Sequence, residues 1–186
     1  MLVLASQSPR RSEILRQAGI PFTVRVGAVD ETPLEGERPE DYVVRLAELK
    51  ALAVPAGEDE TVLGADTTVV IDGEMLGKPA DAADARRMLG RLSGRQHAVI
   101  TGICLKHGVE VVRDCAATKV WFAPMSAREI EEYVASGEPM DKAGAYAIQG
   151  LASKFVERID GCYFNVVGLP AALVWDRLAH LTRFRK

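Results

Sequence analysis

The segment LVLASQSPRR, residues 2–11, joins an apolar run to a helix start and so decides the fold class. The run Leu2 to Ala5 predicts a short buried strand, because an apolar residue fills every position. Ser8 stands where a helix N-cap belongs, and Pro9 suits the first helical position. A buried strand that leads directly into a helix is a building unit of α/β proteins.

Two adjacent arginines occupy the first turn of this predicted helix. Arg10 and Arg11 lie where the helix dipole favours carboxylates and disfavours cations. An anion between the two guanidinium groups would relieve that repulsion, and the Ser8 hydroxyl adds a further donor. The segment therefore predicts a polyphosphate site, with two solvent-exposed arginines as the alternative.

The rest of the chain alternates predicted strands with predicted helices. Further strands are expected over residues 22–26, 61–71, 96–105, 110–122, 155–159 and 162–167, and further helices over 40–54, 81–92, 126–135 and 170–181. Hairpin turns are expected at 72–73, 107–108 and 160–161, and a short strand within the loop 136–150. This order predicts a single α/β domain over residues 1–186, with a mixed, twisted sheet and flanking helices.

Bulk composition places the chain among ordinary globular proteins. It has 186 residues and a net charge of −3, so no basic field invites a nucleic-acid backbone. No apolar run approaches the roughly 18 residues of a membrane span, and the N-terminus lacks the features of a signal peptide. A cytoplasmic location without nucleic-acid or membrane partners is therefore expected. The three cysteines form no Cys-x-x-Cys pair, which predicts reduced thiols.

Lys50 is expected on or beside the buried face of the helix over 40–54. Val43, Leu46 and Ala47 define the apolar stripe of that helix, and Lys50 follows Val43 by two helical turns. Its ammonium either extends to water along the helix surface or projects into an internal cleft.

Asp66 interrupts a strand that is otherwise apolar. A carboxylate in a buried strand must be paired, hydrogen-bonded, protonated or bound to a metal. Gly64, shortly before it, indicates a bulge or the close approach of a ligand. We therefore expect Asp66 to be a functional group, with a structural aspartate bonded to backbone amides as the alternative. Thr67 adds a hydroxyl beside it, although threonine is also an ordinary strand residue.

Lys78 lies in a Gly-Lys-Pro turn that superficially resembles a phosphate loop. The segment from Gly73 to Lys78 has one residue too few between its glycines, and Pro79 stands where a Walker A loop needs serine or threonine. A Walker A loop is therefore excluded. A lysine on a rigid turn can still contact phosphate, and simple turn chemistry is the alternative.

Two loops add further polar candidates. Glu31 lies in an acidic loop and is a candidate to join Asp66 in holding a hard divalent cation, because magnesium needs only one or two carboxylates beside substrate phosphates. Gln149 lies in a glycine-bearing loop, and its amide matches the N3–H and O4 edge of uracil or thymine, although an amide can flip to suit other bases. Tyr146 in the same loop is expected in the core.

Taken together, these segments resemble the Maf family. The matching motifs are LASQSPRR (4–11), YVVRLAELKA (42–51), GADTTVVIDGEMLGKP (64–79), EPMDKAGAYAIQG (138–150) and VVGLP (166–170). They occur in the family's order and span nearly the whole chain. The resemblance implies an α/β fold like that of inosine triphosphate pyrophosphatases, in which two lobes enclose a cleft.

The resemblance also implies an activity. Maf proteins are nucleoside triphosphate pyrophosphatases that use a divalent cation, expected here as Mg²⁺, Mn²⁺ or Co²⁺, and release a nucleoside monophosphate and pyrophosphate. One branch prefers dTTP and UTP and is similar to this chain at Arg10, Thr67 and Gln149. The branch that acts on 7-methyl-GTP has tryptophan, glutamine and glutamate there. Hydrolysis of dTTP and UTP is thus implied, with modified pyrimidine nucleotides as the alternative substrates.

The motifs assign a role to each candidate residue. Asp66 is expected to accept a proton from the attacking water or to bind the cation, with Glu31 as a second acidic ligand. The expected substrate ligands are Ser8, Arg10, Arg11, Lys50 and Lys78 for the triphosphate, and Arg10, Thr67 and Gln149 for the base. The alternative from another class is a nucleotide-binding regulator of cell division in which hydrolysis is incidental. The family resemblance also leads us to expect a homodimer.

Overall fold

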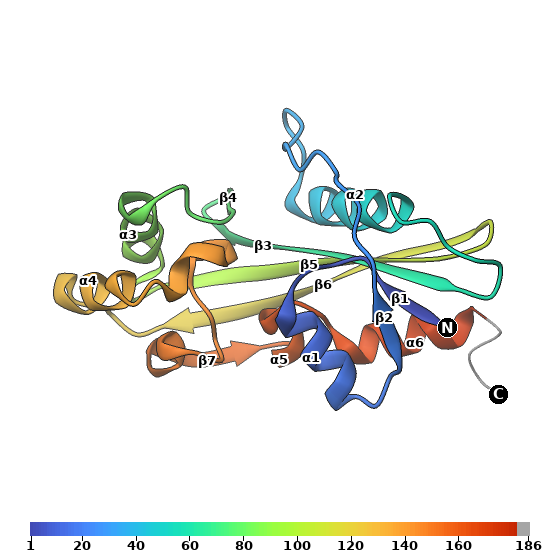
Figure 1. The fold of residues 1–186 in the computed structure, drawn as a ribbon. Helices are drawn as coiled ribbons and strands as arrows, with labels where there is room; N and C mark the ends of the chain where they lie inside the picture. The colour runs from blue at the N-terminus through green and yellow to red at the C-terminus, as the bar shows by residue number, and fades with distance from the viewer. Residues whose placement is uncertain (182–186) are drawn as a thin grey trace. The chain divides into compact units, whose positions relative to one another are not determined.

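Strands and helices alternate in the structure, a computed structural model that describes residues 1–181 (Figure 1). The strands are β1 (Leu2–Leu4), β2 (Phe22–Val24), β3 (Thr61–Ile71), β4 (Glu74–Leu76), β5 (Gln96–His107), β6 (Glu110–Phe122) and β7 (Val156–Asp160). The α-helices are α1 (Pro9–Gln17), α2 (Pro39–Leu52), α3 (Ala82–Leu92), α4 (Ala127–Ala135), α5 (Tyr163–Val167) and α6 (Ala171–His180). Short 3-10 helices are η1 (Glu138–Asp141), η2 (Ala143–Ala145) and η3 (Leu151–Phe155).

The strands form one mixed sheet. Their order is β2-β1-β3-β5-β6-β7, and β4 pairs with β3 outside this path. Strand β1 pairs in parallel with β2 and with β3, whereas β4 pairs antiparallel with β3 and β7 antiparallel with β6. The predicted α/β class with a mixed sheet is therefore confirmed.

The chain divides into two compact units. Unit 1 comprises Met1–Thr67, Thr101–Ala116 and the chain from Gly168 onward, and unit 2 comprises Thr68–Ile100 and Ala117–Val167. Strands β3, β5 and β6 contribute residues to both units. Within residues 1–181 there is no helix that is both long and apolar enough to cross a bilayer.

Local sequence signals set most element boundaries. Helix α1 is followed by Gly19, whose φ of +67° is a backbone conformation that glycine adopts without strain. The Asp81 side chain caps α3 by accepting a hydrogen bond from the Asp84 amide at 2.8 Å. Ser126 and Glu129 form a capping box at the start of α4, the helix predicted over 126–135. The predicted hairpins that join β3 to β4 and β5 to β6 are present as well.

The prediction of a strand over 162–167 is wrong, because most of this segment forms helix α5. A short apolar run does not distinguish a strand from a buried helix. The Asn165 amide, which is buried, donates to the Val99 carbonyl oxygen and to the Thr118 hydroxyl, both at 2.9 Å. The helical turn thereby places the amide nitrogen of a buried polar side chain against two acceptors inside unit 2.

The short strand expected within 136–150 is also absent from the described chain, which forms η1 and η2 there. Gly144 and Ala145 have φ values of +67° and +59°, so the backbone cannot stay extended. A Cβ on Gly144 would lie 2.7 Å from a Val69 methyl group, so this position requires glycine. The Gly144 amide donates to the Gly77 carbonyl oxygen at 3.1 Å and ties this loop to the turn after β4.

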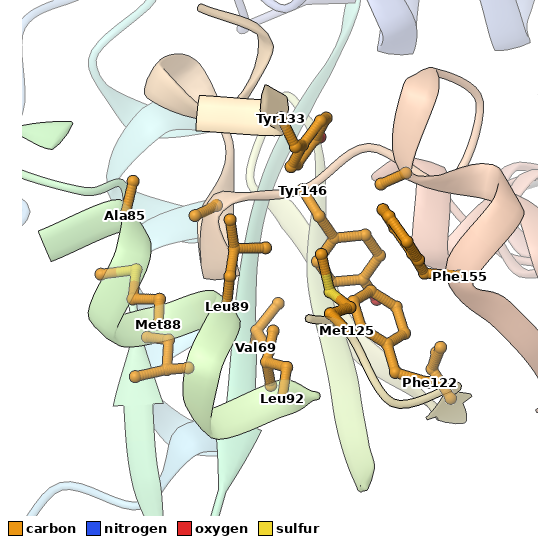
Figure 2. Close-up of a cluster of buried hydrophobic side chains, with 14 of the residues drawn as sticks. Val69, Ala85, Met88, Leu89, Leu92, Phe122, Met125, Tyr133, Tyr146 and Phe155 are labelled. Atoms are coloured by element: carbon orange, nitrogen blue, oxygen red, sulfur yellow. The ribbon is translucent and has the colours of Figure 1, made fainter. Parts of the chain in front are cut away.

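Each unit has an apolar core. The core of unit 2, shown in Figure 2, includes Val69, Ala85, Met88, Leu89, Leu92, Phe122, Met125, Tyr133, Tyr146 and Phe155. Tyr146 is buried there as predicted, with its ring edge-on to Phe122 at a centroid distance of 4.7 Å. A cluster in unit 1 includes Val3, Ala5, Ala47, Ala51, Val54, Val62 and Cys104, which come from β1, α2, β3 and β5 and the segments that follow them.

Candidate active site

Helix α2 lies directly against two glycines of the sheet. A Cβ on Gly64 of β3 would lie 1.9 Å from the Ala47 carbonyl oxygen, and a Cβ on Gly102 of β5 would lie 2.4 Å from the Val43 carbonyl oxygen. Any side chain at either position would push the helix away. The expected bulge or ligand approach at Gly64 is therefore replaced by the approach of a helix backbone.

This close approach places the Lys50 ammonium beside two carboxylates. Its Nζ atom lies 2.6 Å from Asp66 Oδ1 and 2.7 Å from Glu31 Oε1. The Lys50 side chain is 15% exposed and that of Asp66 is 12% exposed, so water screens their attraction only weakly. The Lys50 ammonium is therefore paired within a charged cluster of unit 1 and does not extend along the helix surface to open water.

One oxygen of Asp66 is uncommitted. Oδ1 accepts the Lys50 hydrogen bond, whereas Oδ2 makes no hydrogen bond with any residue in the range 1–181. Within residues 1–181 no backbone amide donates to Asp66, so the alternative of a structural aspartate bonded to backbone amides is not observed there. A carboxylate oriented on one side and open on the other can accept a proton or bind a cation.

The acidic loop that carries Glu31 is held by helix α2. The Tyr42 hydroxyl donates to the Glu31 carbonyl oxygen at 3.0 Å. Burial, with the nearby charges of Asp66 and Glu31, raises the pKa of Tyr42 to about 12, so this hydroxyl keeps its proton at neutral pH. Arg45 donates to the Thr32 carbonyl oxygen at 3.1 Å and pairs with Glu37 at 2.6 Å. Sequence analysis does not identify Tyr42 and Arg45 as anchors, because no local pattern shows that a tyrosine or an arginine holds a loop.

The two carboxylates suit a hard divalent cation that also binds substrate phosphates. Asp66 and Glu31 both reach one cationic atom, Lys50 Nζ, so their oxygens lie around a common centre. No group of three His, Cys, Asp or Glu side chains able to hold a metal occurs within residues 1–181. Magnesium is commonly bound by one or two carboxylates together with phosphate oxygens and water, which matches this donor set.

The Arg11 guanidinium hydrogen-bonds to the chain on either side of Asp66. The Arg11 residue is 9% exposed. Its Nε donates to the Gly168 carbonyl oxygen (2.8 Å), and its Nη1 donates to Ser6 Oγ (2.9 Å) and the Ala65 carbonyl oxygen (2.8 Å). Its Nη2 donates to Thr67 Oγ1 at 3.1 Å. Four of about five guanidinium N–H groups are thereby committed within the protein.

The Arg11 contacts fall on both neighbours of Asp66 in the chain, Ala65 and Thr67. Burial lowers the pKa of Arg11, while the Asp66 charge acts in the opposite direction. The Thr67 hydroxyl also hydrogen-bonds to Thr101 Oγ1 at 2.9 Å and to the Gly168 carbonyl oxygen at 3.4 Å. Gly168, from the VVGLP motif, is a site residue that sequence analysis did not single out.

Ser8 and Arg10 lie at the N-terminus of α1. Ser8 occupies the N-cap position, but its hydroxyl makes no capping hydrogen bond and meets no other partner within residues 1–181. The Ser8 amide donates to Ser6 Oγ at 3.2 Å. Ser8 and Arg10 are both half-buried. The Ser8 hydroxyl is therefore available to an anion at this helix end.

Lys78 and Gln149 belong to unit 2 and are described within it. Lys78 lies in the turn after β4, and Gln149 lies in the loop after η2; both residues are exposed. Neither side chain makes a hydrogen bond with the described part of the chain. The backbone hydrogen bond from Gly144 to Gly77 joins the two loops that carry them.

Comparison with known proteins identifies relatives over nearly the whole chain. The family described as Maf-like protein matches residues 1–181. The dTTP/UTP pyrophosphatase of Symbiobacterium thermophilum is 56% identical over 170 residues, which cover 91% of this chain and 88% of the relative. That of Geobacter metallireducens is 54% identical over 180 residues, which cover 95% of this chain and 94% of the relative.

Two solved structures are also similar. One is a nucleoside-triphosphatase, or dITP/XTP pyrophosphatase, from Mycobacterium abscessus, with a TM-score of 0.41 and 19% identity over 68% of this chain and 76% of that chain. The other is the Ham1 protein of Staphylococcus aureus, with a TM-score of 0.46 and 18% identity over 66% of this chain and 71% of that chain.

Proposed function

The chain belongs to the Maf family, and from this premise we propose that it is a nucleoside triphosphate pyrophosphatase that hydrolyses dTTP and UTP. Curated relatives named dTTP/UTP pyrophosphatase share 56% and 54% of its residues over most of its length. The observation in the structure that supports this activity is the Asp66 carboxylate. One of its oxygens accepts a hydrogen bond from the Lys50 ammonium, and the other makes no hydrogen bond within residues 1–181. A protein that only senses a nucleotide needs no carboxylate open to water.

In the proposed reaction, water attacks the α-phosphorus and the bond from that phosphorus to the bridging oxygen breaks. The products are the nucleoside monophosphate and pyrophosphate. Asp66 Oδ2 takes a proton from the attacking water, while Lys50 fixes the carboxylate through Oδ1. The alternative role for Asp66 is to bind the divalent cation together with Glu31.

A divalent cation held by Asp66 and Glu31 would supply positive charge next to the phosphates and polarise the attacking water. Lys50 lies at the same centre, so its ammonium offsets charge that develops on the departing pyrophosphate. Mg²⁺, Mn²⁺ and Co²⁺ are the cations to compare.

We assign the remaining substrate contacts from the family motifs. Ser8, Arg10 and Lys78 bind the triphosphate, and Arg10 also contributes to base selection. Gln149 binds the N3–H and O4 edge of the pyrimidine. Thr67 supports base selection through its place in the hydrogen-bond network around Gly168. Arg11 has one N–H group left for phosphate, so we assign it mainly to holding the segment around Asp66.

The decisive experiment supplies purified protein with dTTP or UTP and a divalent cation and measures pyrophosphate and monophosphate. In H₂¹⁸O, attack at the α-phosphorus places the label in the monophosphate. A panel with CTP, GTP, 7-methyl-GTP and 5-methyl-UTP tests the base preference. Asp66→Asn should lose nearly all turnover. Release of inorganic phosphate instead of pyrophosphate, or full turnover by Asp66→Asn, would contradict the proposal.

Location and assembly stay predictions. The cytoplasmic location and the homodimer expected from the sequence can be tested by fractionation and by light scattering of the pure protein.

A further inference from the structure

Gln149 lies in a tight turn whose two ends are held by side chains. The Gly150 amide donates to the Ala147 carbonyl oxygen at 3.1 Å and closes the turn. On the entering side, the Ala147 amide donates to the Tyr133 hydroxyl at 3.2 Å. On the leaving side, the Leu151 amide donates to both carboxylate oxygens of Glu138, each at 3.1 Å. Hydrogen bonds from backbone amides to these two side chains therefore fix the chain on both sides of Gln149.

The two side chains that hold this turn are bonded to each other. The Tyr133 hydroxyl donates to Glu138 Oε1 at 2.8 Å, so it is at once donor to Glu138 and acceptor from Ala147. Burial, and then the hydrogen bond to Glu138, raise the pKa of Tyr133, so the hydroxyl keeps the proton it donates. The hydroxyl and the carboxylate thus form one clamp, which we call the Tyr133–Glu138 clamp.

Gly150 allows the carboxylate to approach the turn. A Cβ there would lie 2.3 Å from both carboxylate oxygens of Glu138, so a side chain at this position would displace the carboxylate from the turn. The Glu138 backbone is held in turn, because Lys142 Nζ donates to its carbonyl oxygen at 2.7 Å. The EPMDKAGAYAIQG motif therefore contains the turn and Glu138, one of the two side chains that hold it.

The clamp holds a turn whose own side chain is left open. Gln149 is exposed, and its amide makes no hydrogen bond with residues 1–181. The Tyr133 ring already packs in the core of unit 2, so its hydroxyl is not needed for that packing. A rigid backbone under a free amide reduces the entropy lost when that amide binds a partner.

We propose that Tyr133 and Glu138 are positioning residues for base recognition, which fix the turn that presents Gln149 to the pyrimidine. This inference rests on the proposed function, in which Gln149 binds the base edge. It adds two residues that do not touch substrate but set how strongly the enzyme prefers one base. Loosening the turn should weaken recognition of uracil without affecting the chemistry at the phosphorus.

The test compares kcat/KM for UTP and for CTP, two nucleotides that differ in the donor and acceptor pattern of the base edge. The variants are Tyr133→Phe, Glu138→Gln and Gln149→Ala, with the double variant Tyr133→Phe/Gln149→Ala. Matched controls are Tyr163→Phe, an exposed tyrosine of unit 2, and Glu132→Gln, an exposed glutamate of α4. Thermal unfolding and hydrogen exchange at the amides of Ala147 and Leu151 are measured on each protein.

Tyr133→Phe and Glu138→Gln should lower the UTP to CTP ratio of kcat/KM by about tenfold, the factor of one ordinary hydrogen bond. Amide exchange at Ala147 and Leu151 should speed up, and the controls should keep the wild-type ratio. In the Gln149→Ala background, the Tyr133 change should have no further effect on the ratio, because both act through the same amide.

A wild-type ratio in both folded clamp variants would overturn the proposal. Additive effects in the double variant would also overturn it, since Tyr133 would then not act through Gln149. If Tyr133→Phe fails to fold, Glu138→Gln decides. If the wild-type protein releases no pyrophosphate from UTP, the proposed function fails. If Gln149→Ala keeps the wild-type ratio, only the base-reading role of Gln149 and the clamp proposal fail.

Discussion

Lys50 Nζ lies 2.6 Å from Asp66 Oδ1, although the two residues are 16 positions apart in the sequence. Helix α2, which carries Lys50, reaches this position because Gly64 in β3, the strand that carries Asp66, has no side chain to keep the helix away. The pair therefore depends on backbone packing as much as on charge.

Removing the ammonium should leave the carboxylate without its orienting partner. Lys50→Met keeps a similar side-chain length, and kcat for UTP should fall by about 100-fold or more, as for the loss of a preorganised charge. Steady-state kinetics measure this effect. Lys119→Gln, which changes an exposed lysine of β6, is the control and should keep wild-type kcat. Equal turnover of Lys50→Met and wild type would rule out a catalytic role for the pair.

Gly64→Ala should destabilise the fold, because its methyl group would lie 1.9 Å from the Ala47 carbonyl oxygen. Overpacking of this kind costs about 1–3 kcal/mol of unfolding free energy, or more where backbone must move. Urea denaturation provides the measurement. Gly90→Ala in α3 has no atom within 4 Å of its new methyl group and should be stabilising by about 0.5–1 kcal/mol. Similar stability changes in the two variants would refute the close-packing argument.

Arg11→Lys should separate positioning of Asp66 from binding of phosphate. A lysine keeps the charge but cannot bond four acceptors from a planar group, so kcat should fall by about 10-fold or more. Binding of the α,β-imido analogue of UTP, measured by calorimetry, should stay within about twofold of wild type. Arg10→Lys is the comparison and should weaken this binding. A large loss of analogue affinity in Arg11→Lys would assign Arg11 to the phosphates.

His97 should make the fold sensitive to mild acid. Burial lowers the pKa of His97 to about 4, while its Nε2 lies 2.8 Å from the Tyr146 hydroxyl. The unfolded chain, with a histidine pKa of about 6.5, binds more protons than the folded chain between pH 6.5 and 4. The contribution of neutral His97 to the free energy of unfolding is therefore fully present above about pH 6.5. It is lost as the pH falls towards 4, by about 3 kcal/mol in total.

The measurement is urea denaturation of wild type and His97→Gln across this pH range. Glutamine does not titrate, so the variant should show the smaller loss of stability between pH 6.5 and 4. Parallel pH profiles for the two proteins would show that His97 does not contribute.

Local chemistry made much of the fold predictable. Ser126 with Glu129, and Asp81 with Asp84, are capping signals within one turn of each other, and both helices begin where these signals place them. The apolar run over 162–167 carried no such signal. Its helix places the buried Asn165 amide nitrogen against Val99 and Thr118, which are distant in sequence.

In the candidate site, too, features set by local sequence are predictable and features set by contacts distant in sequence are not. Helical periodicity predicts that Lys50 lies beside a buried face, and the cost of a carboxylate in an apolar strand marks Asp66 as a functional candidate. The hydrogen bond from Arg11 to the Gly168 carbonyl oxygen spans 157 positions, and no local pattern encodes it. At Gly64 the sequence predicts that something approaches the strand closely, but it does not predict that the approaching group is the backbone of a helix.

The supports of the two key polar side chains are separate. Lys50 holds the Asp66 carboxylate and Arg11 holds the chain on either side of it, both in unit 1, whereas Tyr133 and Glu138 hold the turn of Gln149 in unit 2. The two sets of contacts share no residue. On the roles proposed above for Asp66 and Gln149, natural drift or laboratory evolution can retune the base preference through the turn of Gln149 while the residues that act on the phosphate are inherited unchanged.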